Sequence, residues 1–405
     1  MSGTQQAAPA LPVGAGAAGG TENAGAGSST AASNPPEGGH LTLFLSGDVM
    51  LGRGIDQILP SPSDPRLYES FITSAKDYVA LAERANGPIP SPVDFGYVWG
   101  DAALALGLRA PDLRIVNLET SITKCGMHDP KGINYRMNPE NMACLKAMRI
   151  DCCVLANNHV LDWSQDGLLD TLESLERAKI AYAGAGRAYV EAASPAVLRT
   201  KGQGRVLVFG FGLTTSGIPK NWAAGRARAG VNVLDGTSAK AITRIADGVR
   251  SRRLAGDLFI ASIHWGNNWG YDIPVDQRSL AHDLIDTAGF DIVHGHSSHH
   301  PKGIEVYRGK LILYGCGDFL NDYEGIKGLR PFRGDLAVAY LAQCSATTGD
   351  LEMLSLMPFQ IRNFQLKQAN DGDRAWLAQT LDRESGPFGT QITLGQDGVL
   401  TAQWQ

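Results

Sequence analysis

The stretch Leu41–Asp48, LTLFLSGD, is a short apolar run that stops abruptly at a polar ending. Its Leu and Phe residues are typical of a strand that is buried on both faces. Five more apolar runs end in the same way, in short clusters rich in residue types that bind metals. Because so many strands end alike, we expect one site assembled from many strand ends. The six clusters are residues 47–48, 117–119, 157–159, 264–266, 294–299 and 317–318.

Helical patterns alternate with these strands. Leucines recur on one face of residues 166–179, and apolar residues do the same in residues 277–288. Strands that are apolar throughout and alternate with helices indicate a largely parallel sheet covered on both faces. The carboxyl ends of such strands meet at one edge, where open α/β sheets bind ligands. Beyond residue 332 we expect further strands and a short helix near residues 375–381.

The composition indicates a globular protein. The chain has 405 residues, 43% of them hydrophobic, which is enough for a large core. The net charge of −5, without a run of Lys and Arg, argues against a nucleic acid partner. No apolar run reaches the roughly 18 to 20 residues that a membrane-spanning helix needs. Residues 1–39 are rich in Ala, Gly and Ser and lack a signal-peptide pattern, which predicts a disordered tail on a cytoplasmic protein.

We expect residues 40–405 to form one domain with an insertion at about residues 56–100. Six prolines interrupt this insertion and leave one helical piece, residues 67–84. An insertion after the first strand lies near the carboxyl ends of the strands, so it is a candidate for substrate selection. A structural flap that touches no ligand is an equally good interpretation.

The cluster residues form a donor set that suits a divalent metal. Carboxylate oxygen, amide oxygen and imidazole nitrogen together favour ions of intermediate hardness such as Mn, Fe or Zn. No cysteine belongs to the clusters, which argues against a structural zinc site. We therefore predict that one or two divalent metal ions are held by Asp48, Glu119, Asn158, His264, His296 and His299.

The segment Asn157–Asp162, NNHVLD, contains the predicted acid–base group. Asn158 can offer an oxygen to the metal while His159 faces a substrate, and Asp162 can orient and charge the imidazole. His159 and Asp162 are therefore the predicted catalytic residues. Arg53, just after the first cluster, either binds an anionic group of the substrate through a bidentate contact or forms a plain ion pair.

These motifs resemble the bacterial capsule-synthesis family called CapA or PgsA, which is associated with poly-γ-glutamate. That family looks like a branch of the calcineurin-like metallophosphoesterases, whose fold is a β-sandwich flanked by helices. The resemblance implies a four-layer α/β/β/α sandwich of two mixed sheets flanked by helices. The family's marks lie in order within residues 41–321, at 47–53 (GDVMLGR), 117–119 (NLE), 157–159 (NNH), 264–266 (HWG), 295–299 (GHSSH) and 310–319 (KLILYGCGDF).

The resemblance also implies roles for individual residues. Asp48 matches the first-strand aspartate ligand, and Glu119 stands where the superfamily places its bridging aspartate. Asp162 falls where one branch has the Asp partner of its catalytic histidine, here His159. The remaining ligand positions are matched by Asn158, His264, His296 and His299.

Three departures from the superfamily pattern bear on the number of metal ions. Met50 stands where a second first-strand ligand, a histidine, is expected. Glu119 is one methylene longer than the aspartate it replaces, and two residues rather than one separate His296 from His299. The last cluster, Gly317-Asp318, is interpreted as a family mark and a structural turn, not as a ligand.

Three functions stay open. The first is a metal-dependent hydrolase, in which metal-bound hydroxide attacks a phosphoester or amide of a small molecule, a peptide or polyglutamate. The second is a metal-dependent epimerase that acidifies a carbon beside a carbonyl, with Asp48 and His299 as an acid–base pair. The third is a non-catalytic component of a polyglutamate-synthesising complex. We expect the hydrolase, because the clusters combine metal ligands with an acid–base pair.

Overall fold

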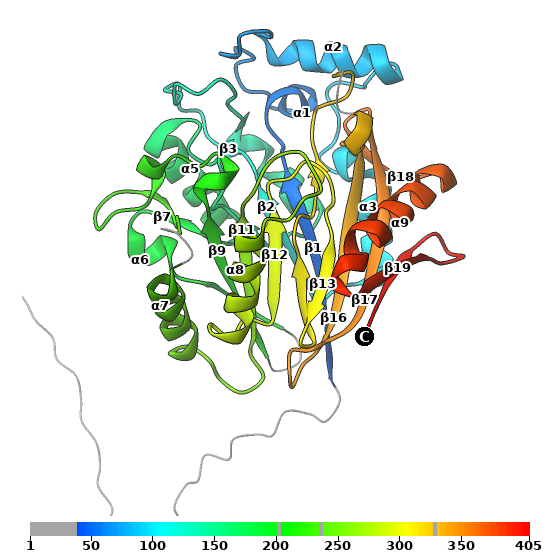
Figure 1. Cartoon of the computed structure of the whole chain (residues 1–405). Coiled ribbons are helices and arrows are strands. Elements are labelled where there is room, and N and C mark those ends of the chain that lie inside the picture. Colours follow the sequence, from blue (N-terminus) through cyan, green and yellow to red (C-terminus); the bar gives the residue numbers. More distant parts are fainter. Residues whose placement is uncertain (1–38, 201–203, 235–237, 327–329) are drawn as a thin grey trace, which may run out of the picture. The chain divides into compact units, whose positions relative to one another are not determined.

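The predicted first strand is β1 (His40–Val49), which lies in the middle of a ten-stranded mixed sheet. A second, six-stranded mixed sheet packs against this larger one (Figure 1). The computed structural model describes residues 39–200, 204–234, 238–326 and 330–405. The predicted tail therefore lies outside the described residues, apart from Gly39.

The larger sheet divides at β1 into a parallel half and an antiparallel half. Its strands in spatial order are β19 (Thr390–Leu394), β20 (Leu400–Trp404), β17 (Leu351–Arg362), β16 (Leu336–Ser345), β1, β2 (Leu113–Leu118), β5 (Cys152–Val154) and β6 (Ala181–Ala183). From β1 to β6 all pairings are parallel, and from β1 to β19 all are antiparallel. Two short strands pair with β1 and β17 respectively, namely β15 (Asp318–Leu320) and β18 (Gln365–Gln368).

The smaller sheet has a parallel centre and antiparallel edges. Its strands in spatial order are β13 (Ile304–Tyr307), β14 (Lys310–Leu313), β12 (Ile292–His296), β11 (Leu258–His264), β9 (Arg205–Gly212) and β8 (Ala196–Arg199). The four central strands run parallel, whereas β13 and β8 pair in the antiparallel direction. Short two-stranded pairs also form, β3 (Ser121–Ile122) with β4 (Arg136–Met137) and β7 (Ala185–Gly186) with β10 (Gly230–Val231).

The apolar strands are buried on both faces, as their sequences predict. Because successive side chains of a strand point to opposite faces, Leu43 and Leu45 of β1 enter the core between the two sheets, while Phe44 enters the core on the outer face. In β5, Cys152 likewise faces the core between the sheets and Cys153 faces outward. Because both faces of these central strands are buried, the strands need continuous apolar runs.

Helices cover the two outer faces. The outer core of the larger sheet includes residues of α3 (Gly100–Arg109), α4 (Ala143–Ala147) and α5 (Ser164–Ala178), and that of the smaller sheet includes α7 (Ala239–Arg250) and α8 (Val275–Asp286). This arrangement confirms the α/β/β/α sandwich. The C-terminal helix α9 (Asp371–Ser385) instead joins the core between the sheets, beside β19. A short helix, α6 (Tyr189–Ala192), follows β7.

The insertion after β1 forms α1 (Arg53–Ile58) and α2 (Ala75–Asn86), which lie above the carboxyl end of β1 in Figure 1. The helix predicted over residues 67–84 begins only at Ala75, because Ser74 is extended and its side chain accepts a hydrogen bond from the Lys76 N–H. Residues 67–74 are therefore not helical, which corrects the prediction. Among the described residues, no helix has the length and apolar character needed to cross a membrane.

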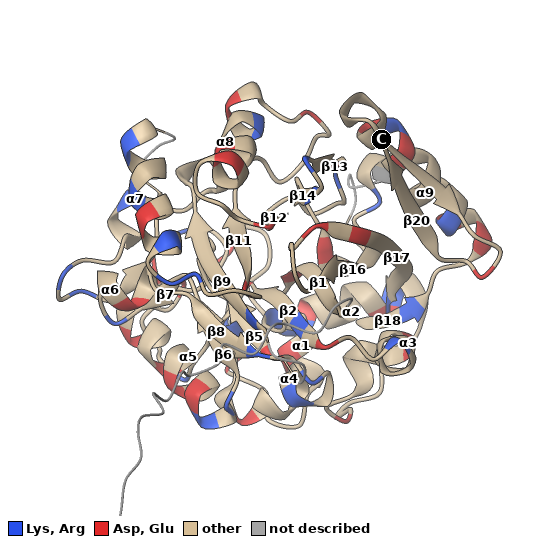
Figure 2. Ribbon diagram, turned by 90° about the horizontal axis from the view of Figure 1, so that it is seen from below, with Lys and Arg blue, Asp and Glu red and all other residues tan. Residues whose placement is uncertain are grey.

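Charged residues of both signs are interspersed over the ribbon in the view of Figure 2. Some of these charges form exposed ion pairs, such as those that Arg187 makes with Glu176 of α5 and Glu191 of α6. Such mixing gives a weak local field over this face. The prediction that nucleic acid is not a partner stays a prediction.

The core between the sheets should dominate stability. We expect Leu45→Ala to lower the free energy of unfolding by about 2 to 5 kcal/mol, because Leu45 is fully buried between the sheets and its truncation leaves a cavity. The matched control is Leu104→Ala on α3, where the side chain is 69% exposed, with an expected change within about 0.5 kcal/mol. Urea denaturation of both variants measures the difference, and equal losses would contradict this account of the core.

Candidate metal centre

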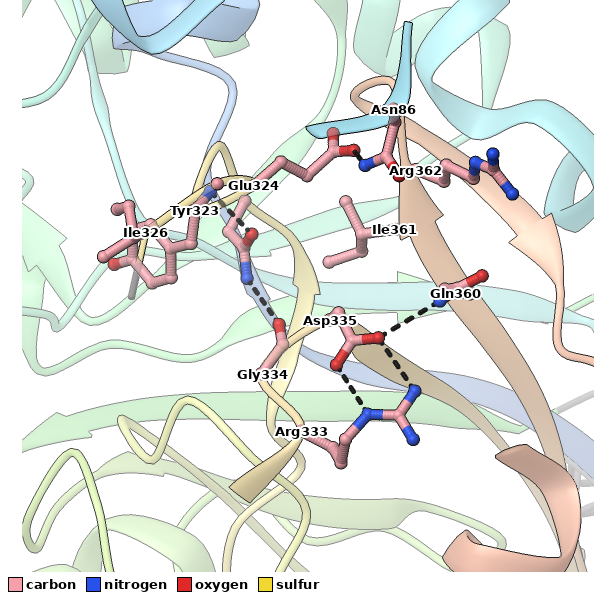
Figure 3. Close-up of a pocket in the computed structure, with 12 residues that line it drawn as sticks. Asn86, Tyr323, Glu324, Ile326, Arg333, Gly334, Asp335, Gln360, Ile361 and Arg362 are labelled. Carbon is pink, nitrogen blue, oxygen red and sulfur yellow. Dashed lines mark hydrogen bonds and ion pairs between the residues drawn. The ribbon is translucent and has the colours of Figure 1, made fainter. Parts of the chain in front are cut away.

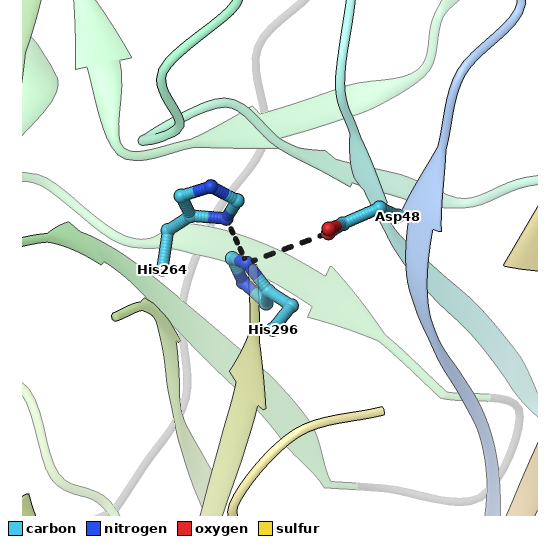
Figure 4. A group of neighbouring side chains, drawn as sticks. All are labelled: Asp48, His264 and His296. Carbon is cyan, nitrogen blue, oxygen red and sulfur yellow. Dashed lines mark hydrogen bonds and ion pairs between the residues drawn. The ribbon is translucent and has the colours of Figure 1, made fainter. Parts of the chain in front are cut away.

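Strand ends of both sheets bring the predicted ligands together. Asp48 is near the end of β1, and His264 and His296 are the last residues of β11 and β12, where they stand opposite one another in register. Figure 4 shows the three side chains pointing toward one another. One ligand atom from each lies within 4.8 Å of the others, and all three residues are buried. They form the first candidate metal group.

The two imidazoles of this group lie close together and face Asp48. His264 Nδ1 is 2.7 Å from His296 Nδ1, and His296 Nδ1 is 3.9 Å from Asp48 Oδ1. Burial holds the pKa of both histidines well below the usual range, so both rings are neutral near pH 7. Ligands of a tetrahedral ion at about 2.1 Å lie roughly 3.4 Å apart. The two nitrogens are at hydrogen-bond distance, so a small separation of the rings would let both bind one ion.

A second candidate group shares Asp48 and adds His299 and Asp318. Asp318 begins β15, which runs parallel to β1 with Asp318 in register with Asp48. His299 Nδ1 lies 2.9 Å from Asp318 Oδ1. Burial lowers the pKa of His299, but the Asp318 and Asp48 carboxylates outweigh it and raise the pKa overall. The interpretation of Asp318 as a structural turn missed this placement beside two predicted ligands.

The environment of Asp48 favours a bound proton or cation. Its Oδ1 accepts a hydrogen bond of 2.7 Å from the Asn117 amide, whereas its Oδ2 is buried without a hydrogen-bond partner. Burial and the neighbouring Asp318 raise the pKa of Asp48 to about 7. A buried carboxylate oxygen without a partner is unfavourable unless a proton or a cation compensates it. The donor set of oxygen and imidazole nitrogen fits a divalent metal ion.

Glu119 and Asn158 border the first group. Glu119 Oε1 lies 4.0 Å from His264 Nε2, and Asn158 Oδ1 lies 2.9 Å from the same nitrogen. Burial and the Asp48 carboxylate raise the pKa of Glu119 well above its usual range. Neither residue belongs to the two groups that share Asp48, so their roles as ligands stay predictions. The structure does place both against the same histidine.

The predicted catalytic pair is present as a hydrogen bond. His159 Nδ1 donates to Asp162 Oδ2 at 2.6 Å, and His159 Nε2 lies 3.8 Å from Glu119 Oε1. Burial lowers the pKa of His159 to about 4, although Asp162 acts in the opposite direction. Sequence reasoning missed two neighbours. Lys131 forms an ion pair of 2.6 Å with Asp162 Oδ1, and the Tyr135 ring stacks on the imidazole at 3.9 Å.

A chain of hydrogen bonds fixes the tautomer of His296. A backbone carbonyl only accepts, so His294 Nε2–H donates to the Ser46 carbonyl at 2.9 Å. Burial lowers the pKa of His294 to about 4, so the ring is neutral and its Nδ1 accepts from the Ser262 hydroxyl at 2.9 Å. Ser262 Oγ in turn accepts from His296 Nε2–H at 3.0 Å. His296 Nδ1 therefore keeps its lone pair for the metal group.

Arg53 lies in a buried ion-pair network beside the centre. Its guanidinium donates to Asp322 at 2.9 Å, to Glu69 at 2.9 Å and to the Tyr78 hydroxyl at 2.9 Å. The guanidinium also stacks over the Tyr78 ring at 3.6 Å. The structure thus shows the ion-pair alternative for Arg53, while contact with a substrate stays a prediction. Glu69 and Tyr78 belong to the insertion, which Arg53 therefore ties to the end of β1.

A cavity of about 410 Å³ adjoins the second group (Figure 3). Asn321 lines it and donates to Asp318 Oδ2 at 2.8 Å, and Tyr323 lines it with its ring 5.3 Å from His299, edge to face. Cationic Arg333 and Arg362 line the same cavity, as does Asn86 at the end of α2. The insertion thus contributes to a cavity next to the candidate metal centre.

The fold and site together define an α/β sandwich with a candidate metal centre at the strand ends of its two sheets. Residues 42–323 match the family described as bacterial capsule synthesis protein PGA_cap, and the chain belongs to this family. The match confirms the resemblance inferred from the motifs. It covers every candidate ligand, including Asp318, and ends at Tyr323.

Relatives extend the match over nearly the whole chain. A protein of Mycobacterium tuberculosis named "Probable polyglutamine synthesis accessory protein" is 44% identical over 365 residues, 89% of this chain and 95% of the relative. The PGA biosynthesis protein CapA of Bacillus subtilis is 26% identical, covering 84% of this chain and 80% of the relative. Among solved structures, the chain aligns with GAP50, the anchor in the inner membrane complex of Plasmodium. The alignment covers 79% of this chain and 84% of that chain, with 8% identity and a TM-score of 0.32. This similarity is too low to bear on fold or function.

The hydrogen-bond chain makes a testable prediction about metal affinity. His294→Phe removes the donor to Ser46 and frees the Ser262 hydroxyl, so the His296 tautomer is no longer fixed. We expect metal affinity to fall roughly 10- to 100-fold, measured by competition with a chromogenic chelator. His282→Phe is the control, because His282 bonds to Glu305 away from the centre. Equal affinity in the two variants would refute the role of the chain.

The Arg53 network makes a prediction about stability. Arg53→Ala leaves the buried carboxylates of Asp322 and Glu69 unpaired, so we expect unfolding to become easier by about 3 to 5 kcal/mol. Arg187→Ala, which removes an exposed ion-paired arginine, should change stability by at most about 1 kcal/mol. Chemical denaturation of both variants provides the comparison. A small loss for Arg53→Ala would show that the network does not stabilise the insertion.

Proposed function

We propose that this protein is a metal-dependent hydrolase that acts in the synthesis or processing of poly-γ-glutamate or a related capsular polymer. Family membership and the names of its relatives support the polymer. The single observation behind hydrolysis is that an acid–base pair and a metal group converge on one carboxylate. Glu119 Oε1 lies 3.8 Å from His159 Nε2 and 4.0 Å from His264 Nε2.

Asp48, His264 and His296 would hold a divalent ion, which would act as a Lewis acid and supply a nucleophile at neutral pH. Asp162 accepts the Nδ1 proton of His159, so the opposite nitrogen, Nε2, faces the centre. Nε2 can take up a proton from the attacking water and return it to the leaving group. Lys131 and Tyr135 hold the pair in place through an ion pair and a ring stack.

One arginine of the cavity beside Asp318 supports an acidic substrate. Arg362 is exposed at the cavity wall, whereas Arg333 is paired with Asp335 and Asp373. A γ-linked glutamate chain carries one carboxylate per residue, and such groups pair well with guanidinium. We infer that the bond to be cleaved, an amide or a phosphoester, would lie at the metal group while the flanking carboxylates occupy the cavity. The cytoplasmic location stays a prediction from the sequence.

The hydrolase proposal is tested with the purified full chain on nitrophenyl phosphate esters, a γ-glutamyl anilide and poly-γ-glutamate. We expect turnover that chelation abolishes and Mn²⁺, Fe²⁺ or Zn²⁺ restores. His159→Ala should lower kcat roughly 100- to 10,000-fold while the metal content stays unchanged, whereas His264→Ala should lower the metal content itself. His282→Ala is the control, because His282 lies on the outer helix α8 and its ring bonds to Glu305.

Two outcomes would favour the other functions. Solvent deuterium at an α-carbon without bond cleavage would indicate an epimerase. No turnover on any substrate, together with full metal content, would indicate a non-catalytic component of a polymer-synthesising complex. Full turnover of metal-stripped protein would overturn the proposal itself.

A further inference from the structure

Asp318 is brought to the centre by a contact between two glycines. The Asp48 N–H donates to the Gly317 carbonyl at 3.1 Å, and β15 then continues parallel to β1. A Cβ at Gly47 would lie 1.9 Å from that carbonyl oxygen, and Gly317 has a φ of 75° with no room for a side chain beside Pro301. The close approach therefore requires glycine at both position 47 and position 317. The common effect of the two glycines is to set Asp48 and Asp318 side by side.

Position 50 does not supply a ligand to this edge of the centre. The Met50 side chain is buried in the apolar core on the outer face of the larger sheet. A thioether is also a poor ligand for hard and intermediate divalent ions. Asp318, from the neighbouring strand, is the additional carboxylate that this edge of the centre holds.

The charges at the centre favour bound cations. Asp48, Glu119 and Asp318 are all buried, and within the described ranges their ion-pair partners are histidines alone. The nearby cations are engaged elsewhere, since Lys131 pairs with Asp162 and Arg53 with Asp322. Three buried carboxylates without a lysine or arginine partner are unfavourable unless protons or bound cations compensate their charges.

We propose that Asp318 is a metal ligand which, with His299 and Asp48, holds a second divalent ion and takes the place of the ligand missing at Met50. The inference rests on the metal centre of the proposed function, but not on the reaction it performs. Asp48, with an unpartnered buried oxygen, lies in both groups and is the common ligand of the two ions. Asn321 holds Asp318 in position by donating to its Oδ2 at 2.8 Å.

The experiment counts metal ions with the full chain, stripped by chelator and titrated with Mn²⁺ by calorimetry. For the native chain we expect about two ions per chain. Asp318→Ala and His264→Ala should each bind about one, the two changes together none, and Asp48→Ala none, because Asp48 serves both groups. Electron paramagnetic resonance of the Mn²⁺-loaded protein should show a coupled pair that Asp318→Ala converts to an isolated ion.

Asp291→Ala is the matched control, because Asp291 is an equally buried aspartate that precedes β12 at the opposite end of the smaller sheet from His296. It should keep both ions and the coupled signal, and far-ultraviolet circular dichroism should verify that each variant is folded. If Asp318 only oriented His299, Asp318→Ala would still bind two ions with weaker affinity, and that result would overturn the proposal. One ion in both the native chain and Asp318→Ala would overturn it too. Because these readouts need no substrate, absent turnover would count against the hydrolase alone.

Discussion

The hydrogen bond from His294 to the Ser46 carbonyl joins the two sheets at the point where the site forms. It runs from β12 of the smaller sheet to β1 of the larger one. The Ser46 carbonyl can only accept a hydrogen bond, so His294 must be the donor. This fixes the direction of the bonds from Ser262 to His294 and from His296 to Ser262, and it leaves His296 Nδ1 without a proton. The packing of one sheet on the other therefore sets the protonation pattern of a candidate metal ligand. A shift of one sheet against the other would therefore disturb both the hydrogen bond between the sheets and the tautomer of His296.

The close approach of β1 and β15 is a second constraint of the same kind. Glycines at 47 and 317 allow backbone contact where other residues would clash. Through this contact a segment that follows the smaller sheet returns to the larger one and places its carboxylate beside Asp48. Aromatic contacts connect the predicted catalytic pair with the second candidate group. Tyr135 stacks on His159 and bonds to Tyr323, and the Tyr323 ring contacts His299 edge to face.

Much of this architecture could be predicted from the sequence, since apolar strands and polar strand ends are local patterns. The periodicity of the sequence alone predicted a single, largely parallel sheet. The resemblance to the capsule-synthesis family added the prediction that the strands divide into two sheets. The interpretation of Asp318 as a turn residue was wrong, because Asp318 begins a strand, and only the pairing of β15 with β1 reveals its neighbours. Lys131 and Tyr135 lie in a loop without a motif. His294 is two residues before His296 in β12 and therefore shares its face, but only the fold shows that Ser262 and Ser46 link its ring to His296. Their positions follow from tertiary contacts that no local pattern encodes.

The order of the candidate ligands along the chain has a consequence for biosynthesis. Asp48, Glu119 and Asn158 lie in or after strands of the larger sheet, and His264, His296 and His299 lie in or after strands of the smaller one. Asp318 belongs to the larger sheet again. In addition β1 is flanked on one side by β16, which is made later still. A nascent chain on the ribosome thus lacks a finished centre until most of its length has emerged. The candidate centre can therefore be complete only after the chain has been made as far as β16.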